Sequence, residues 1–294
     1  MIVLTGATGK IGSRITSNLL SQAKKVRCIV RTPEELQQFS SEGAEASVGS
    51  LDDIYFLTKA FSDAAAVFTM IPRDYSVPDF RAYQNKVGAS IAEAIEKSGV
   101  KYVVNLSSQG AHLPDRTGPI KGLHDQEERL NRLRDVNILH MRPTYFMENL
   151  FMYIPMIKNM NIAGSAINGD LKFAMIATKD IATAATEHLI RMDFVEKSIR
   201  DFLGQRDLSF REALSIIGKR INRPDLKYVQ FSYKDSRKGL LAAGLSEDMT
   251  NLIIEMSRAL NDGLFAVNVP RTEENTTATS IEEFADTFAK IYFS

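Results

Sequence analysis

The stretch MIVLTGATGKIG, residues 1–12, decides how this chain is expected to fold. An apolar strand, MIVLT, runs into a turn in which Gly6, Gly9 and Gly12 are evenly spaced before a helix. Glycines are needed at such a turn because the backbone bends sharply and its N–H groups must approach a pyrophosphate at the start of the helix. A strand, this motif and a helix in that order predict a nucleotide-binding loop, and the alternative is a tight structural turn.

Beyond this loop, short apolar runs alternate with amphipathic segments. Strands are expected in MIVLTG, KVRCIV, AEASVG, AAAVFTMI, VKYVVNLSS and NILHMRP, and helices over residues 10–22, 33–41, 51–61, 79–97 and 121–134. This alternation predicts βαβ units and a parallel sheet, and strands that are apolar on both faces indicate helices on both sides. We therefore predict an α/β fold with a Rossmann-type doubly wound sheet.

The pattern loosens after Pro143. It continues as TYFMENLFMYIPMIKNM, a strand LKFAMIA, a helix KDIATAATEHLI, a strand near residues 199–203 and mostly helix up to Ser294. We expect an NAD(P)-binding domain over residues 1–145 and a smaller, mostly helical substrate lobe over residues 146–294, interwoven with the last sheet elements. Pro155 is expected to kink or end its helix. The methionines and aromatics around it could line an apolar pocket, and the alternative is core packing.

The composition narrows the classes of function and partner that we expect for this protein. The chain has 294 residues, of which 44% are apolar and 24% charged, and Lys+Arg and Asp+Glu both number 36. There is no basic excess for binding nucleic acid, no apolar stretch of the roughly 20 residues that a membrane helix needs and no basic signal-like start. We expect a cytoplasmic protein without nucleic-acid or membrane partners. The single cysteine, Cys28 in VRCIV, is expected to be a buried, inert thiol.

The end of the second expected strand indicates which dinucleotide is bound. An acidic residue about 20 residues after the glycine motif would bind the ribose hydroxyls of NAD, but this chain has Arg31 and Thr32 in CIVRTP. An arginine fork suits the additional 2′-phosphate of NADP, and Lys10 in the glycine loop adds a second charge. We therefore expect NADPH in preference to NADH. The alternative is that Arg31 only begins a surface loop.

Five stretches resemble the NmrA-like branch of the atypical short-chain dehydrogenase/reductase superfamily. They are TGATGKIGSRI, VRCIVRTP, NKVGASIAEAIEKSGVKYVVNLSS, LHMRPTYFMENLF and KDIATAA, in the right order over about the whole chain. The most characteristic piece is the strand that ends in RP and is followed by FMEN. The resemblance implies NADP binding. Some members reduce quinones, azo compounds or plant phenolics, and others are non-catalytic sensors of the NADPH/NADP balance that bind regulatory proteins.

The resemblance also implies roles for individual residues. The residues implied in cofactor binding are Gly6, Thr8, Gly9, Lys10 and Ile11 at the phosphates, Arg31 at the 2′-phosphate, Ser50 and Leu51 at the adenine, Met70, Ile71, Pro72 and Ser107 at the nicotinamide side, and Pro143, Thr144, Tyr145 and Phe146 at the far wall. Family members usually carry aspartate where Ser50 stands. Tyr75 and Asn149 are implied on the substrate side.

The catalytic tyrosine and lysine of the superfamily begin the helix after the fifth strand. Here that helix reads GPIKGLHDQEERL and has no tyrosine. Lys121 and His124 are the polar groups left at this end, and histidine is suited to donating a proton near neutral pH. The alternative is that His124 is a surface residue.

Tyr55 and Lys59 in DDIYFLTKAF have the helical spacing of a tyrosine–lysine pair. They lie in the middle of the helix between the third and fourth strands, whereas ligands of open α/β folds bind beyond the carboxyl ends of the strands. We therefore expect Tyr55 to pack against the sheet and Lys59 to be solvated. No metal site is expected, because the four histidines have no ligand spacing.

Two functions agree with these observations. One is an NADPH-dependent reductase of a small planar acceptor such as a quinone or azo compound. The other is a regulatory NADP(H) sensor with a protein partner. The apolar stretch after Asn149 favours the reductase and the missing tyrosine favours the sensor. We prefer the reductase.

Overall fold

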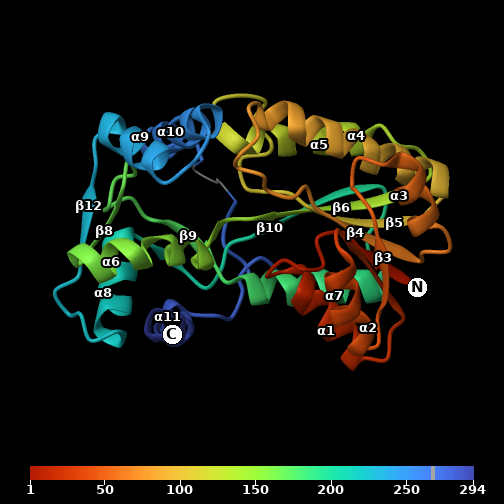
Figure 1. Cartoon of the computed structure of the whole chain (residues 1–294), viewed down its shortest axis with the longest axis horizontal. Coiled ribbons are helices and arrows are strands. Elements are labelled where there is room, and N and C mark those ends of the chain that lie inside the picture. The colour runs from red at the N-terminus through yellow and green to blue at the C-terminus, as the bar shows by residue number, and fades with distance from the viewer. Residues whose placement is uncertain (266–268) are drawn as a thin grey trace.

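A parallel seven-stranded sheet forms the centre of the protein (Figure 1). The computed structural model describes residues 1–265 and 269–294. The strands, in the spatial order β10-β6-β5-β4-β1-β2-β3, are β1 Ile2–Leu4, β2 Val26–Val30, β3 Glu45–Val48, β4 Ala66–Thr69, β5 Tyr102–Leu106, β6 Asn137–Pro143 and β10 Lys197–Phe202. The order runs outward from β1 in both directions, so the predicted doubly wound sheet is confirmed.

Helices cover both faces of this sheet (Figure 1). One face is covered by α1 Gly12–Ser21, α2 Pro33–Ser41 and α7 Thr178–Arg191, and the other by α3 Ile54–Phe61, α4 Phe80–Ser98 and α5 Lys121–Asn131. Each helix buries an apolar stripe, such as Ile15 and Leu19 on α1 or Leu57 and Phe61 on α3. The burial of these stripes is the main stabilising term of the fold.

The sequence also explains where these helices begin. Thr32 and Glu35 form a reciprocal capping box at α2, with Pro33 in its first turn. Asp53 and Asp79 accept hydrogen bonds from the first turns of α3 and α4. These side chains satisfy N–H groups that the helix itself leaves without a partner.

Tyr55 does not pack as expected. Its side chain is 82% exposed, and the buried face of α3 consists of Leu57, Ala60 and Phe61. Tyr55 precedes Leu57 by two residues, which places it about 200° around the helix from the buried stripe. The prediction for Tyr55 was therefore wrong, whereas Lys59 is exposed as expected. Cys28 is buried as expected, and burial raises the pKa of its thiol to about 11.

The second half of the chain adds a lobe with its own core (Figure 1). Its elements are β7 Tyr145–Phe146, η2 Met147–Tyr153, α6 Ile154–Met160, β8 Ile162–Ser165, β9 Phe173–Ile176, β11 Asp207–Leu208, α8 Phe210–Arg220, β12 Lys227–Gln230, α9 Tyr233–Ala242, α10 Glu247–Asn261 and α11 Ile281–Phe293. The short strands form the sheets β11-β9-β7 and β12-β8. Strand β10 and helix α7, which also follow residue 146, complete the large sheet and one of its helical layers. A division between residues 145 and 146 stays a prediction.

Candidate functional site

Ligands of open α/β folds bind in a crevice beyond the carboxyl ends of the strands where the strand order reverses, which in this sheet is between β1 and β4. Thr5 follows β1 and Met70 follows β4. The amide N–H of Met70 donates to Thr5 Oγ1 at 3.0 Å, and the amide of Thr5 donates to the carbonyl of Phe68 at 3.0 Å. These bonds hold the glycine loop beside the loop MIPRDY, so two of the predicted cofactor segments meet at one sheet edge.

The glycine loop admits no larger residues at two of its positions. Gly6 has φ +66°, and a Cβ there would lie 2.6 Å from Met70 Sδ. A Cβ on Gly12 would lie 2.2 Å from the carbonyl oxygen of Gly6. Helix α1 then begins at Gly12 without a capping side-chain hydrogen bond from Ile11 and with no acidic residue in its first turn. The amide of Ser13 donates to the carbonyl of Gly9 at 2.9 Å, so an anion at this helix start would meet the remaining N–H groups of the turn.

Two exposed cations flank this loop. Lys10 Nζ lies 4.5 Å from the ring centroid of Phe151, so the second half of the chain reaches over the glycine loop. Arg31 follows β2, where its amide donates to Glu35 Oε2 at 2.8 Å and its side chain is exposed. The hydrogen bond from Ser76 chiefly lowers the pKa of Asp74, and the charge of Arg31 adds to this effect. The guanidinium is thus within electrostatic range of the loop after β4.

The remaining predicted cofactor residues differ in how accessible they are. Ser50 donates to Asp52, which pairs with Lys86 at 2.6 Å. The amide and hydroxyl of Thr144 donate to the carbonyl of Phe202 at 3.1 and 3.2 Å, so this side chain is occupied by β10. Exposed or half-buried residues are Gly6, Thr8, Gly9, Lys10, Arg31, Ser50, Leu51, Met70, Pro72, Tyr145 and Phe146, and buried ones are Ile11, Ile71, Ser107, Pro143 and Thr144.

Ser107 directs its hydroxyl toward a buried ion pair. It donates to Glu127, which is 3% exposed and also accepts from Arg142 through Nε at 3.0 Å and Nη2 at 2.5 Å. Burial would raise the pKa of Glu127, but the hydrogen bonds from Arg142 and Ser107 outweigh it and keep that pKa below its ordinary value. The hydroxyl of Ser107 is therefore occupied by Glu127.

The sequence contains a pattern that indicates the ion pair between Glu127 and Arg142, although we did not predict this pair. Glu127 lies on the apolar stripe of α5, four residues after Leu123 and three before Leu130. A carboxylate on such a stripe needs a charged partner because its burial is otherwise costly. Arg142, inside the apolar run NILHMRP, is that partner.

His140 on β6 is fully buried and links several elements. Its Nδ1 lies 3.1 Å from Asn105 Nδ2 and its Nε2 lies 3.0 Å from Asn131 Oδ1, while Thr69 donates to Asn105 Oδ1 at 3.1 Å. In this arrangement Nδ1 accepts and Nε2 donates, as in a neutral ring. Burial lowers the pKa of His140 to about 4. The residue is thus a neutral structural bridge from β5 and β6 to α5.

Lys121 lies at the predicted end of α5 but is held in ion pairs. Its Nζ lies 2.9 Å from Glu255 Oε2 and 3.8 Å from Asp115 Oδ1, and its side chain is 14% exposed. Glu255 also accepts from the amide of Gly118, at 3.3 Å, in the short helix η1 Gly118–Ile120. Helix α10 therefore packs over the start of α5, and Lys121 anchors it there. This arrangement does not favour a catalytic role for Lys121.

His124 lies one turn further along α5 and is half-buried. Its Nδ1 is 2.8 Å from the carbonyl oxygen of Ala111, which can only accept a hydrogen bond. The nitrogen must therefore carry the hydrogen, and Nε2 of the neutral ring is an acceptor. Within residues 1–265 and 269–294, no hydrogen bond to Nε2 is present.

Aromatic side chains line the predicted substrate side. Tyr145 meets Phe173 and Phe210 edge-on, with both centroids 5.5 Å away. Tyr75 is 40% exposed, and its carbonyl accepts from the amide of Ser246 at 3.3 Å just before α10. Asn149 is half-buried in η2. Tyr145 thus packs against the core of the lobe, and the segment before α10 contacts the loop that carries Tyr75.

A sequence model of the NmrA-like family matches residues 1–285. The chain belongs to the NmrA-like family. It is 26% identical to a (4-alkanoyl-5-oxo-2,5-dihydrofuran-3-yl)methyl phosphate reductase of Streptomyces griseus, with 94% of this chain and 93% of the relative covered. It is also 26% identical to an NAD(P)H azoreductase of Xenophilus azovorans, with 99% and 98% covered. Its structure is similar to an Escherichia coli NADPH-dependent quinone oxidoreductase complexed with NADPH, with a TM-score of 0.84, 18% identity and 98% and 99% covered.

Glu148, in the stretch FMEN that pointed to the NmrA-like family, caps the start of helix α7. Both carboxylate oxygens of Glu148 accept from the amide of Thr178 at 3.0 Å, and Oε1 accepts from its hydroxyl at 2.5 Å. Glu148 thereby caps α7, whose own capping residue, Ala177, has no side-chain acceptor. The two residues are far apart in the sequence, so no local pattern predicts this contact.

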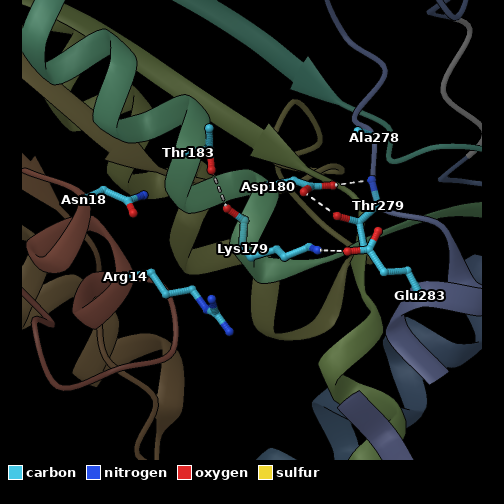
Figure 2. A pocket seen from close by; sticks show the side chains of 8 residues that line it. All are labelled: Arg14, Asn18, Lys179, Asp180, Thr183, Ala278, Thr279 and Glu283. Atoms are coloured by element: carbon cyan, nitrogen blue, oxygen red, sulfur yellow. Dashed lines mark hydrogen bonds and ion pairs between the residues drawn. The ribbon is translucent and has the colours of Figure 1, made fainter. Parts of the chain in front are cut away.

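A cavity of about 400 Å³ lies beside α1 and α7 in this NmrA-like protein. Figure 2 shows the side chains that line it. Most of the polar groups in it bind one another. Lys179 pairs with Glu283, and Asp180 accepts from the amide and hydroxyl of Thr279, at 3.1 and 2.5 Å. These contacts join α7 to the segment before α11, and none of the predicted site residues lies among those that line the cavity.

In the described part of this NmrA-like protein, no cluster of three or more His, Cys, Asp or Glu is arranged to bind a metal ion. None of the helices described combines the length and the apolar composition that crossing a membrane requires.

Proposed function

We propose that this NmrA-like protein is an NADPH-dependent oxidoreductase whose acceptor is a small planar molecule such as a quinone or azo compound. The observation that carries the proposal is the cradle formed by Gly6, Gly9 and Gly12 in front of the uncapped start of α1. A side chain at Gly6 would meet Met70 and one at Gly12 would meet the backbone of the loop itself, so the turn needs glycines, as a dinucleotide-binding turn does. The reductase names of the relatives support the same reaction class.

The residues present fit NADPH. The backbone of Gly6, Thr8, Gly9, Lys10 and Ile11 would hold the phosphates, and Lys10 and Arg31 would supply positive charge. Ser50 and Leu51 are proposed at the adenine, Met70, Ile71 and Pro72 along the loop after β4, and the segment from Pro143 to Phe146 at the opposite wall. When bound, NADPH supplies the hydride.

The protein's own contribution to the reaction is mainly positioning. Aromatic residues such as Tyr145 and Phe146 would hold a planar acceptor and exclude water, with Tyr75 and Asn149 at the edge of its site. Placing two reactants in contact supplies a large part of a rate enhancement by itself. His124 is the proposed proton donor, through Nε2, to the acceptor as it becomes an anion.

NADPH oxidation with a panel of quinones, azo dyes and enones tests the proposal. We expect turnover with at least one planar acceptor, detected as loss of NADPH absorbance. Direct titration of the cofactor should accompany the assay. Binding of NADPH without oxidation by any acceptor would contradict the reductase and favour a sensor.

A further inference from the structure

Arg73, in the loop MIPRDY between β4 and α4, lies over an aromatic ring at the crevice. Its guanidinium carbon is 5.8 Å from the ring centroid of Phe146. Its Nη1 donates to the hydroxyl of Tyr75 at 3.1 Å. Two residues proposed for the cofactor and substrate sides thus contact one cation, although the sequence did not single out Arg73.

Phe146 fixes the position of this cation relative to the sheet. The ring packs in the core cluster that includes Met70 and Leu106. Phe146 comes three residues after β6 ends at Pro143, and Arg73 comes four residues after β4 ends at Thr69, so both follow the carboxyl ends of strands of the sheet. This is the edge at which ligands of open α/β folds bind. Arg73 is therefore at the mouth of the crevice rather than at a remote surface.

The guanidinium is not neutralised by the protein. Within residues 1–265 and 269–294, Arg73 forms no ion pair with a carboxylate, and the adjacent Asp74 accepts hydrogen bonds from the amide and hydroxyl of Ser76, at 3.1 and 2.6 Å. The positive charge of Arg73 acts on Tyr145, where it opposes the burial that raises the pKa of that phenol well above its ordinary value. Arginine has five N–H donors in a planar fork, and the hydroxyl of Tyr75 takes one. The others suit an oxyanion.

We propose that Arg73 binds an anionic group, such as a sulfonate, carboxylate or phosphate, carried by the aromatic acceptor. The acceptor ring would lie against the aromatic wall that includes Phe146 while its oxyanion meets the guanidinium. This inference deepens the proposed function, because it assigns the acceptor to the class of acidic aromatic compounds.

A pair of probes that cannot be reduced separates this inference from the reductase activity. Naphthalene-2-sulfonate and naphthalene-2-sulfonamide have similar size but differ in charge. Their dissociation constants should be measured by titration calorimetry on the NADP⁺-loaded wild type and on Arg73→Ala, Arg73→Lys and Arg132→Ala. Arg132 is an exposed arginine at the end of α5 and serves as the control.

We expect the wild type to bind the sulfonate at least about tenfold more tightly than the sulfonamide, the size of one charge-assisted contact. Arg73→Ala should abolish this preference, Arg73→Lys should keep part of it, and Arg132→Ala should keep it. No preference in the wild type, or an equal loss for both probes in Arg73→Ala, would overturn the inference. A loss of NADPH affinity in Arg73→Ala with the sulfonate preference intact would also overturn it, since Arg73 would then serve the cofactor. Failure of the reductase assay would leave these binding results unchanged, so the two failures can be distinguished.

Discussion

Arg142 holds both carboxylate oxygens of Glu127, with Nε 3.0 Å from Oε1 and Nη2 2.5 Å from Oε2. Arg142 belongs to β6 and Glu127 to α5, and Ser107, just after β5, donates to the same carboxylate. The side chains of the two charged residues are 13% and 4% exposed. The pair therefore joins two strands and a helix directly behind the crevice, in a setting where losing one partner leaves a buried charge.

Glu127→Gln should lower the free energy of unfolding by about 3 kcal/mol, because Arg142 keeps its charge but loses the carboxylate. Urea denaturation followed by circular dichroism measures the change. Glu45→Gln is the matched control, since it removes the exposed ion pair between Glu45 and Arg27 and should cost less than about 1 kcal/mol. Equal effects of the two substitutions would show that the buried ion pair contributes no more to the free energy of unfolding than the exposed one.

The sequence predicted the sheet well because the patterns that indicate its strands and helices involve residues close together in the chain. Mostly apolar strand runs, helix periodicity and the glycine loop all depend on neighbouring residues, and the corresponding elements are present. Lys121 shows what such local patterns do not predict. Its position at the start of α5 was predicted, but its ion pair with Glu255 joins residues that are distant along the chain. The prediction for Tyr55 failed for a different reason. The buried stripe of α3 runs through Leu57, Ala60 and Phe61, and Tyr55 lies on the other side of the helix.

Stability should fall in mild acid because of His140. The unfolded imidazole binds a proton near its ordinary pKa of 6.5, whereas the folded one binds it only near pH 4. The unfolded state therefore takes up the proton first, so this contribution is complete above about pH 6.5 and is lost as the pH falls toward 4. The shift corresponds to about 3 kcal/mol.

His140→Gln should remove this part of the pH dependence. Urea denaturation of wild type and variant at a series of pH values between 7 and 4.5 measures it. Other carboxylates titrate in both proteins, so the difference between the two curves is the relevant quantity. Parallel curves would mean that His140 is protonated in the folded protein as easily as in the unfolded chain.

Gly12→Ala should disrupt the cofactor loop. Its Cβ would meet the backbone oxygen of Gly6 at 2.2 Å, and a backbone atom cannot move aside cheaply. We expect NADPH affinity to fall at least about tenfold, because the displaced N–H groups no longer meet the pyrophosphate. Gly239→Ala, in α9 with nothing within 4 Å of the new Cβ, should keep the affinity and add about 0.5–1 kcal/mol of stability. Unchanged affinity in Gly12→Ala would contradict the proposed cradle.

Arg31→Ala should reduce the preference for NADPH over NADH. Arg31 is exposed after β2, and removing one charge-assisted contact to a 2′-phosphate costs about 1.5–3 kcal/mol. Affinity for NADH should change little, because this cofactor lacks the phosphate. Fluorescence titration of both cofactors gives the two values. Equal affinity of the wild type for NADPH and NADH would refute the assignment.

His124 gives the sharpest test of chemistry within the proposed reductase. Because Nδ1–H donates to Ala111, only the doubly protonated ring can donate from Nε2. His124→Ala should lower turnover by about 10² to 10⁴ while NADPH affinity barely changes, since a general acid acts in the transition state.

His124→Asn separates an acid from a structural contact, because the amide of asparagine can still donate to the carbonyl of Ala111 but cannot supply a proton. If His124 only holds the loop that carries Ala111, the asparagine variant should recover most of the wild-type turnover. If His124 is the acid, the asparagine and alanine variants should be similarly slow. Full turnover in His124→Ala would exclude the acid role but not the reductase, since a quinone held against the cofactor can accept hydride through positioning alone.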